Sequence, residues 1–300
     1  MYIIIIQLKK CICQVFCMIF TKLIKNCKIK IMRLEVKISK NIFILFLALN
    51  AYSYNDENNK NGMHPIRKKI RTIIKKYNYN QKCPYLKKIF KKTGIWYLIY
   101  VLLEKNGKIK KNSKSKISFI LNLKKFAKEP FIENSWNVLK NYETKEIKKI
   151  SPLFKKETKK IISFINKPIK DLKKIILIIN PLDAYWRGYA LKIKETGYIV
   201  VGPGAEKNHC ELIRHELLHI LAPSYNIPIK FTSPKDHQRA VKLGYTNRNI
   251  IQKEYIVHSL NLIYQSKILK KDIKQVIIQE KKYFPHLQKI IKIVKEQIEK

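Results

Sequence analysis

The stretch NHCELIRHELLHILAP, residues 208–223, decides the fold of the C-terminal half of the chain. Asn208 is a good helix N-cap, and Glu211 three positions later completes a pattern similar to a capping box. Pro223 stops a helix from continuing. The stretch therefore predicts a helix over residues 209–222. One of its faces is apolar and fit for burial, and consists of Ile213, Leu217, Ile220 and Leu221.

The predicted helix carries two histidines on a different face. His215 and His219 lie four residues apart, so their side chains point from the same side of the helix. Two imidazoles one turn apart can bind a single metal ion, and Glu216 beside them faces the coordination position that is left open. This arrangement indicates a zinc site with one ion per chain.

The His-Glu-Leu-Leu-His motif resembles the signature of the zincin metallopeptidases. In the metzincin branch, a Gly and a third His follow the second His by three and six residues. Ala222 and Tyr225 occupy those positions here, which excludes that branch. The motif is similar to the gluzincin branch, which takes its third ligand from a Glu on a later helix. The resemblance covers roughly residues 174–265 and implies an α+β fold, with a small twisted sheet and two ligand-bearing helices.

Glu254 is the candidate for the third ligand by this resemblance. It lies on a predicted helix over about 248–265, which is largely apolar, and a carboxylate there needs a partner such as a metal ion. His258 occupies the position where many gluzincins have an Asp that orients a metal-binding His. Three alternatives stay open: His258 as the ligand itself, or Asp236 or His237 in the preceding loop.

The resemblance implies a zinc-dependent peptidase that acts on peptides or proteins. Zinc would bind a water molecule and lower its pKa, and Glu216 would take the proton and deliver it to the leaving amine. Tyr245, His237 and Arg248 are the candidate donors to the developing oxyanion. The strand that precedes the metal helix is expected to be the edge strand to which substrate adds, with Tyr198 and Val200 as contacts.

The pattern along the chain changes near residue 172. Residues 172–300 are expected to form the zincin-like domain, with a strand over 174–179 and a hairpin whose Gly197 supplies a positive φ. Residues 54–171 are expected to be a mostly helical region that supports the site. Its predicted helices include 116–127, 134–148 and 153–165.

Residues 1–53 are predicted to be a leader. A basic segment begins at Met32, a short apolar run covers 42–49, and Ala51-Tyr52-Ser53 offers small residues at a signal-peptidase site. The prediction is a signal peptide over 32–53 and export to the periplasm or the extracellular space. The alternative is an uncleaved N-terminal membrane anchor. After cleavage only Cys83 and Cys210 would remain, and whether they pair stays open.

The charge of the chain is strongly positive, with 63 Lys and Arg against 21 Asp and Glu. Only seven of these bases are Arg, and the lysines are spread along the whole chain without aromatic interleaving. Such a surface is typical of compositional bias, so we expect no specific nucleic-acid partner, although peripheral contact with a membrane surface is possible. Two alternatives to a peptidase stay open: an inactive zincin-fold binding module, and a basic protein that binds nucleic acid or a membrane surface. The oligomeric state is not predicted.

Overall fold

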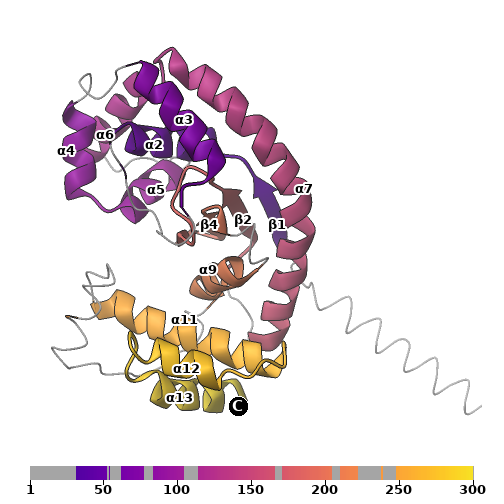
Figure 1. Cartoon of the computed structure of the whole chain (residues 1–300). Coiled ribbons are helices and arrows are strands. Elements are labelled where there is room, and N and C mark those ends of the chain that lie inside the picture. The colour runs from indigo at the N-terminus through magenta and orange to yellow at the C-terminus, as the bar shows by residue number, and fades with distance from the viewer. Residues whose placement is uncertain are drawn as a thin grey trace, which may run out of the picture. The chain divides into compact units, whose positions relative to one another are not determined.

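The computed structural model describes residues 32–52, 54, 62–77, 84–104, 114–165, 171–204, 210–221, 238 and 248–299. By its contacts the chain divides into Met1–Arg33 and Leu34–Lys300, and the second unit contains the elements discussed below. The structure combines many helices with one small sheet. The chain therefore belongs to the α+β class, as predicted. Figure 1 labels most of these elements along the chain.

The sheet has four strands in the order β1-β2-β4-β3. They are β1 (Arg33–Lys37), β2 (Lys174–Ile179), β3 (Gly188–Ile193) and β4 (Thr196–Val201). β2 runs parallel to β4, and β3 pairs with β4 antiparallel. The predicted strand and hairpin are therefore confirmed, and a strand from the predicted leader adds to the sheet at β2.

β4 is an inner strand, and the prediction that it forms the substrate-binding edge is wrong. One side of β4 pairs with β2 over its whole length, and the other side pairs with β3. Tyr198 and Val200 therefore have no free backbone edge for a peptide, because both of their ladders are occupied. Val200 is also fully buried. The outer strand on this side is β3.

The turn between β3 and β4 differs from the predicted one in detail. Lys194 takes the positive φ, at 53°, while Gly197 lies inside β4 without one. A Cβ on Gly197 would lie 3.0 Å from Ile220 Cγ2. Gly197 is thus needed for the close packing of Ile220 on the sheet and not for the turn.

The N-terminal half of the unit is helical. Its helices are α2 (Lys40–Ala51), α3 (Pro65–Lys76), α4 (Pro84–Lys92), α5 (Ile95–Leu103), α6 (Lys114–Phe126) and α7 (Phe131–Ile165). α7 replaces two predicted helices because it continues through Pro152. A proline removes one helix hydrogen bond and crowds the preceding turn. Burial of Ile150 and Phe154 on either side of Pro152 holds the helix together.

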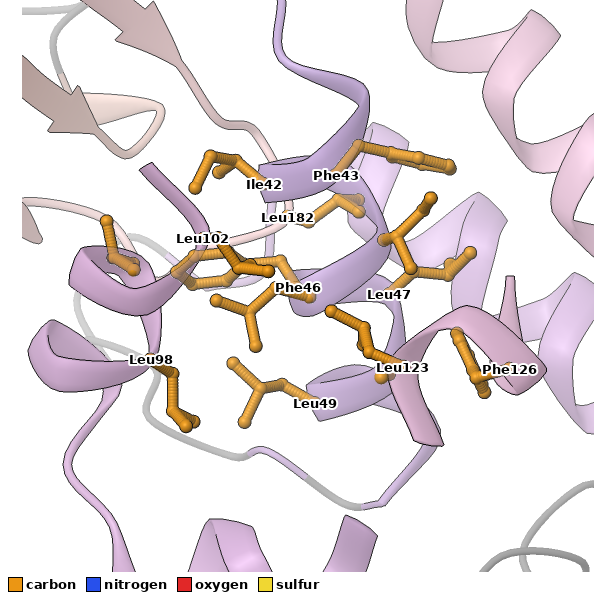
Figure 2. Packing of buried hydrophobic residues seen from close by; sticks show 14 of the residues in the cluster. Ile42, Phe43, Phe46, Leu47, Leu49, Leu98, Leu102, Leu123, Phe126 and Leu182 are labelled. Atoms are coloured by element: carbon orange, nitrogen blue, oxygen red, sulfur yellow. The ribbon is translucent and has the colours of Figure 1, made fainter. Parts of the chain in front are cut away.

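α2 is the centre of the hydrophobic core in this half (Figure 2). Every apolar side chain from Ile42 to Ala51 is at least nine-tenths buried. Figure 2 shows Phe46 and Leu49 of α2 facing Leu98 of α5, and Leu123 of α6 on another side. A helix that is apolar all round is expected to be enclosed by protein or lipid, and here it is enclosed by protein.

Polar contacts also tie α2 to its neighbours. Asn50 donates to the Leu182 carbonyl at 2.9 Å and accepts from Arg67 Nε at 2.7 Å. Tyr54 donates to Asp183 Oδ1 at 2.7 Å. Both links connect the C-terminal end of α2 and the residues just after it to the turn between β2 and β3, so they hold the sheet against the helical half.

Among the described residues, four helices complete the C-terminal half of the unit. They are α9 (Glu211–Leu221), α11 (Arg248–Lys267), α12 (Lys274–Glu280) and α13 (Leu287–Glu299). α9 contacts β3 and β4 on one side and α11 on another, and α11 packs on α13 (Figure 1). The helices predicted over residues 209–222 and about 248–265 are confirmed, with observed bounds of Glu211–Leu221 and Arg248–Lys267. Among the described residues, no helix is long and apolar enough to cross a membrane.

Candidate metal centre

Three of the predicted ligands meet where α9 packs against α11. His215 and His219 project from α9 with their Nε2 atoms 3.2 Å apart. Glu254 projects from α11, with Oε2 at 3.4 Å from His215 Nε2 and Oε1 at 3.3 Å from His219 Nε2. Glu254 is 7% exposed, so its carboxylate is removed from water and faces only these side chains and their neighbours.

The spacing of these three donors suits a zinc ion. Bonds of about 2.0–2.1 Å in a tetrahedron place neighbouring ligand atoms roughly 3.3 Å apart. The two Nε2 atoms match this separation, and each of them lies at about this distance from one of the two Glu254 oxygens. Glu254 Oε2 has no hydrogen-bond partner among the described residues. A buried carboxylate oxygen without a hydrogen bond beside two imidazoles is a good place for a cation. The donor set therefore fits zinc.

His258 lies at the side of this cluster. Its Nε2 is 3.9 Å from Glu254 Oε2, and its Nδ1 is 2.8 Å from Glu280 Oε2 on α12. His215, Glu254 and His258 can each bring one donor atom within 4.8 Å of the others, so they form a second possible set of ligands. His219 Nε2 lies nearer to the Glu254 carboxylate than His258 Nε2 does, at 3.3 Å against 3.9 Å.

Glu216 lies against the first residue of β3. It is 5% exposed, and a Cβ on Gly188 would lie 2.3 Å from Glu216 Oε1. Only a glycine leaves room for the carboxylate there. Burial raises the pKa of Glu216, and the neighbouring His219 and His215 reduce that rise. A carboxylate whose pKa lies closer to neutral is better suited to accept a proton and return it.

The pKa values of Glu254 and His215 also shift, in the directions that their contacts require. Burial by itself would raise the pKa of Glu254, but His215 and His219 outweigh it and hold the pKa well below its usual range. Burial would lower the pKa of His215, yet the contact with Glu254 and the charges of Glu216 and Glu280 raise it. Both shifts reflect a negative carboxylate that attracts positive charge, whether a proton or a metal ion.

A buried arginine fixes α9 in this position. Arg214, one residue before the first ligand, contacts Glu157 on α7 with 2.5 Å between Nε and Oε1. It also donates to Asn261 Oδ1 on α11 at 3.4 Å and lies over the Tyr264 ring. Arg214 and Glu157 are both 5% exposed. The guanidinium group of Arg214 on α9 thus links this helix to the long helix α7 and to α11.

Several predicted site residues lie outside the described part of the chain or lack a described side chain. Asp236, His237 and Tyr245 are outside the described residues, as are Asn208 and Cys83. Arg248 is the first residue of α11, and its side chain is not described. The oxyanion donor therefore stays a prediction, as does the pairing of Cys83 with Cys210.

Three residues that belong to the site were not found from the sequence. Glu280 is one acid on a basic amphipathic segment, Glu157 is one of several acids among lysines on α7, and Gly188 follows an arginine in an apparent loop. Nothing in their local spacing distinguishes them from solvent-exposed residues. Their contacts with His258, Arg214 and Glu216 arise only when distant segments pack together.

A separate cavity of about 740 Å³ lies between α2, α4 and α5. Lys87, Lys91 and Lys92 line it together with Tyr52 and Tyr54. No residue of the cluster of His215, His219, Glu254 and His258 lines this cavity. The candidate metal centre therefore does not coincide with this cavity. The assignment rests on the chemistry and spacing of the donors.

Comparison with known proteins adds no relative. A scan against protein-family models finds no match, and searches of curated proteins and of solved structures find none either. The likeness to zincins therefore rests on the motif and on the geometry of the residues around it.

Proposed function

We propose that the chain is a zinc-dependent metallopeptidase with one ion held by His215, His219 and Glu254. The observation that carries this proposal is that the Nε2 atoms of His215 and His219 lie 3.2 Å apart and each lies within 3.4 Å of one oxygen of the Glu254 carboxylate, with the buried Glu216 next to them. A structural zinc site usually has four protein ligands, whereas three ligands with an adjacent carboxylate are typical of hydrolytic sites. Intact Glu216 favours catalysis over metal binding alone.

The residues of the chain have separate tasks in this mechanism. When bound, a zinc ion would act as a Lewis acid and lower the pKa of a water molecule to near neutrality. Glu216 accepts the proton of the attacking water and then delivers it to the amine of the leaving peptide. Burial keeps the Glu216 carboxylate weakly solvated, which favours this exchange near neutral pH.

The outer edge of β3 is the place where an extended substrate would bind. Arg187 accepts from the Gly202 amide at 2.8 Å, which fixes the alternation of the antiparallel ladder. The backbone groups of Gly188, Ala190 and Lys192 consequently point away from β4. Trp96 of α5 donates to the Ala190 carbonyl at 3.2 Å, while Gly188 lies next to Glu216. A peptide that pairs with Gly188 would therefore lie close to the proposed general base.

Glu216→Gln tests the proposal because it keeps the shape of the side chain and removes the proton acceptor. We expect the wild-type protein to cleave unfolded casein. The variant should cleave it more slowly, by a factor of at least about 10². Zinc content should stay near one ion per chain in the variant. His219→Ala removes a ligand and should lower both zinc content and turnover. Equal turnover in wild type and Glu216→Gln would refute the mechanism.

A further inference from the structure

We infer that Trp96 of α5 is a specificity-determining residue, which selects an aromatic or large apolar side chain of the substrate. The inference rests on the proposed function, because it takes the outer edge of β3 as the place where a peptide binds. Trp96 donates from Nε1 to the Ala190 carbonyl of β3 at 3.2 Å. The indole ring is therefore fixed at the edge along which an extended peptide would lie.

The hydrogen bond from Trp96 limits how far a peptide can pair with β3. The backbone groups of Gly188, Ala190 and Lys192 point away from β4, so they are the groups to which a further strand would bind. Such a strand would place an amide nitrogen about 2.9 Å from the Ala190 oxygen. Trp96 Nε1 already holds this position. A peptide that pairs with Gly188 must therefore leave the edge of the sheet before it reaches Ala190.

The indole ring lies a short way along β3 from the proposed general base. Gly188 packs so closely against Glu216 that no Cβ would fit between them, and it marks the place of the general base on β3. Ala190 follows two residues later, which is about 7 Å along a strand. The substrate side chain that meets Trp96 therefore belongs to a residue close to the bond that is cleaved.

Trp96 offers an apolar surface to that side chain. It is 51% exposed, although its ring is held by Ala190 and by Tyr100, with the two ring planes 7° apart and their centroids at 6.0 Å. Contacts between aromatic rings add favourable free energy to that of burial. A substrate residue with a ring or a large apolar side chain would cover this surface, whereas a small polar one would leave it in water.

The test separates the ring of Trp96 from its hydrogen bond. Trp96→Gln keeps a donor for the Ala190 carbonyl and removes the ring, whereas Trp96→Phe keeps a ring and removes the donor. Tyr85→Ala is the control, because it removes another exposed aromatic ring from the helical half, on α4. All three changes are made in the full-length Glu216→Gln protein with zinc present, so that peptides bind while cleavage is slow.

The probe is a peptide of Ala and Ser with blocked ends, in which one Phe occupies each position in turn. Its affinity is measured by titration calorimetry. We expect Phe at one position to strengthen binding to the Glu216→Gln protein by about 3- to 10-fold. Trp96→Gln should abolish this gain, while Trp96→Phe should keep most of it and Tyr85→Ala all of it.

Each outcome decides the inference. It is overturned if no position of Phe strengthens binding, if the gain survives Trp96→Gln, or if Trp96→Phe loses it. Both Trp96 variants change a half-exposed side chain, so they are expected to fold. A gain that depends on the Trp96 ring, in a protein whose wild type does not cleave casein, would refute the proposed function alone. Cleavage of casein without any preference for Phe would refute this inference alone.

Discussion

α2 and α9 are both almost completely buried helices, yet they are buried for different reasons. α2 is apolar on all sides and lies at the centre of the core between the N-terminal helices. α9 has a buried apolar face, and it also carries the buried charges of Arg214 and Glu216 next to its two histidines. Each of these polar groups is packed against a group on another element.

This difference explains why α9 was predicted from the sequence, whereas α2 was predicted to be part of a signal peptide. The histidine spacing on α9 has a chemical meaning of its own, which does not depend on the rest of the chain. A short apolar run after a basic segment has two physical solutions, a signal peptide or a core helix, and composition does not separate them. Burial of α2 disfavours its removal, and cleavage after Ser53 stays a prediction.

The largest effect should come from removing α2. A protein that starts at Tyr54 lacks β1 and α2, and each large apolar side chain of α2 contributes about 1.5–3 kcal/mol through burial. Their sum exceeds the usual stability of a domain, about 5–15 kcal/mol, so we expect no cooperative thermal transition by circular dichroism. The control protein starts at Met32 and should fold. A folded protein from Tyr54, or a natural N-terminus there by mass spectrometry, would support the signal peptide.

The next largest effect should come from the arginine that fixes α9. Arg214→Met leaves the Glu157 carboxylate buried without its partner, which typically costs about 3–5 kcal/mol. The midpoint of urea unfolding should fall accordingly. The double variant Arg214→Met, Glu157→Met should recover much of this loss, since neither charge then remains. If the single variant were as stable as wild type, the pair would not hold α9 to α7.

Glu143 on α7 provides an effect on stability that is small near pH 5 and grows as the pH rises. Burial raises the pKa of this carboxyl to about 9 from 4.5, and its Oε2 has no hydrogen-bond partner among the described residues. The folded state therefore binds the proton more tightly than the unfolded state. Stability should fall by up to about 1.4 kcal/mol for each pH unit between about 4.5 and 9.

Glu143→Gln removes the titrating carboxyl group, so the test compares the stability of this variant with that of the wild type at each pH. The variant should be more stable than wild type at pH 8, and the difference should shrink toward pH 5. Parallel unfolding curves for the two proteins over this range would show that Glu143 is ionised and solvated in the folded protein.

The smallest effect on stability, but a large one on activity, is expected for Gly188→Ala. The new Cβ would lie 2.3 Å from Oε1 and 2.6 Å from both Cδ and Cγ of Glu216, so the Glu216 carboxylate must move from its place. Turnover should fall by about 10²–10⁴-fold, with zinc content unchanged and the melting temperature shifted by only a few degrees. Gly94→Ala is a matched control, because its Cβ would meet nothing within 4 Å. Full activity in Gly188→Ala would argue against Glu216 as the general base.

The sequence by itself determined the helix predicted over residues 209–222, its two histidines, the adjacent Glu216 and the strands predicted over 174–179 and 198–201, which the structure has at 211–221, 174–179 and 196–201. These features depend on spacing over a few residues, where helix and strand periodicity fixes which side chains share a face. It also indicated Glu254, because an acid on an otherwise apolar helix requires a partner.

Only the tertiary structure decided the remaining features. Packing placed α2 in the core, carried α7 through Pro152 and made β4 an inner strand. Packing also placed Gly197 against Ile220 and Gly188 against Glu216. It brought Glu157 to Arg214 on α9 and Glu280 to His258 on α11. The physical reason is that burial and ion pairing depend on contacts between segments far apart in the chain, and local periodicity carries no information about those contacts.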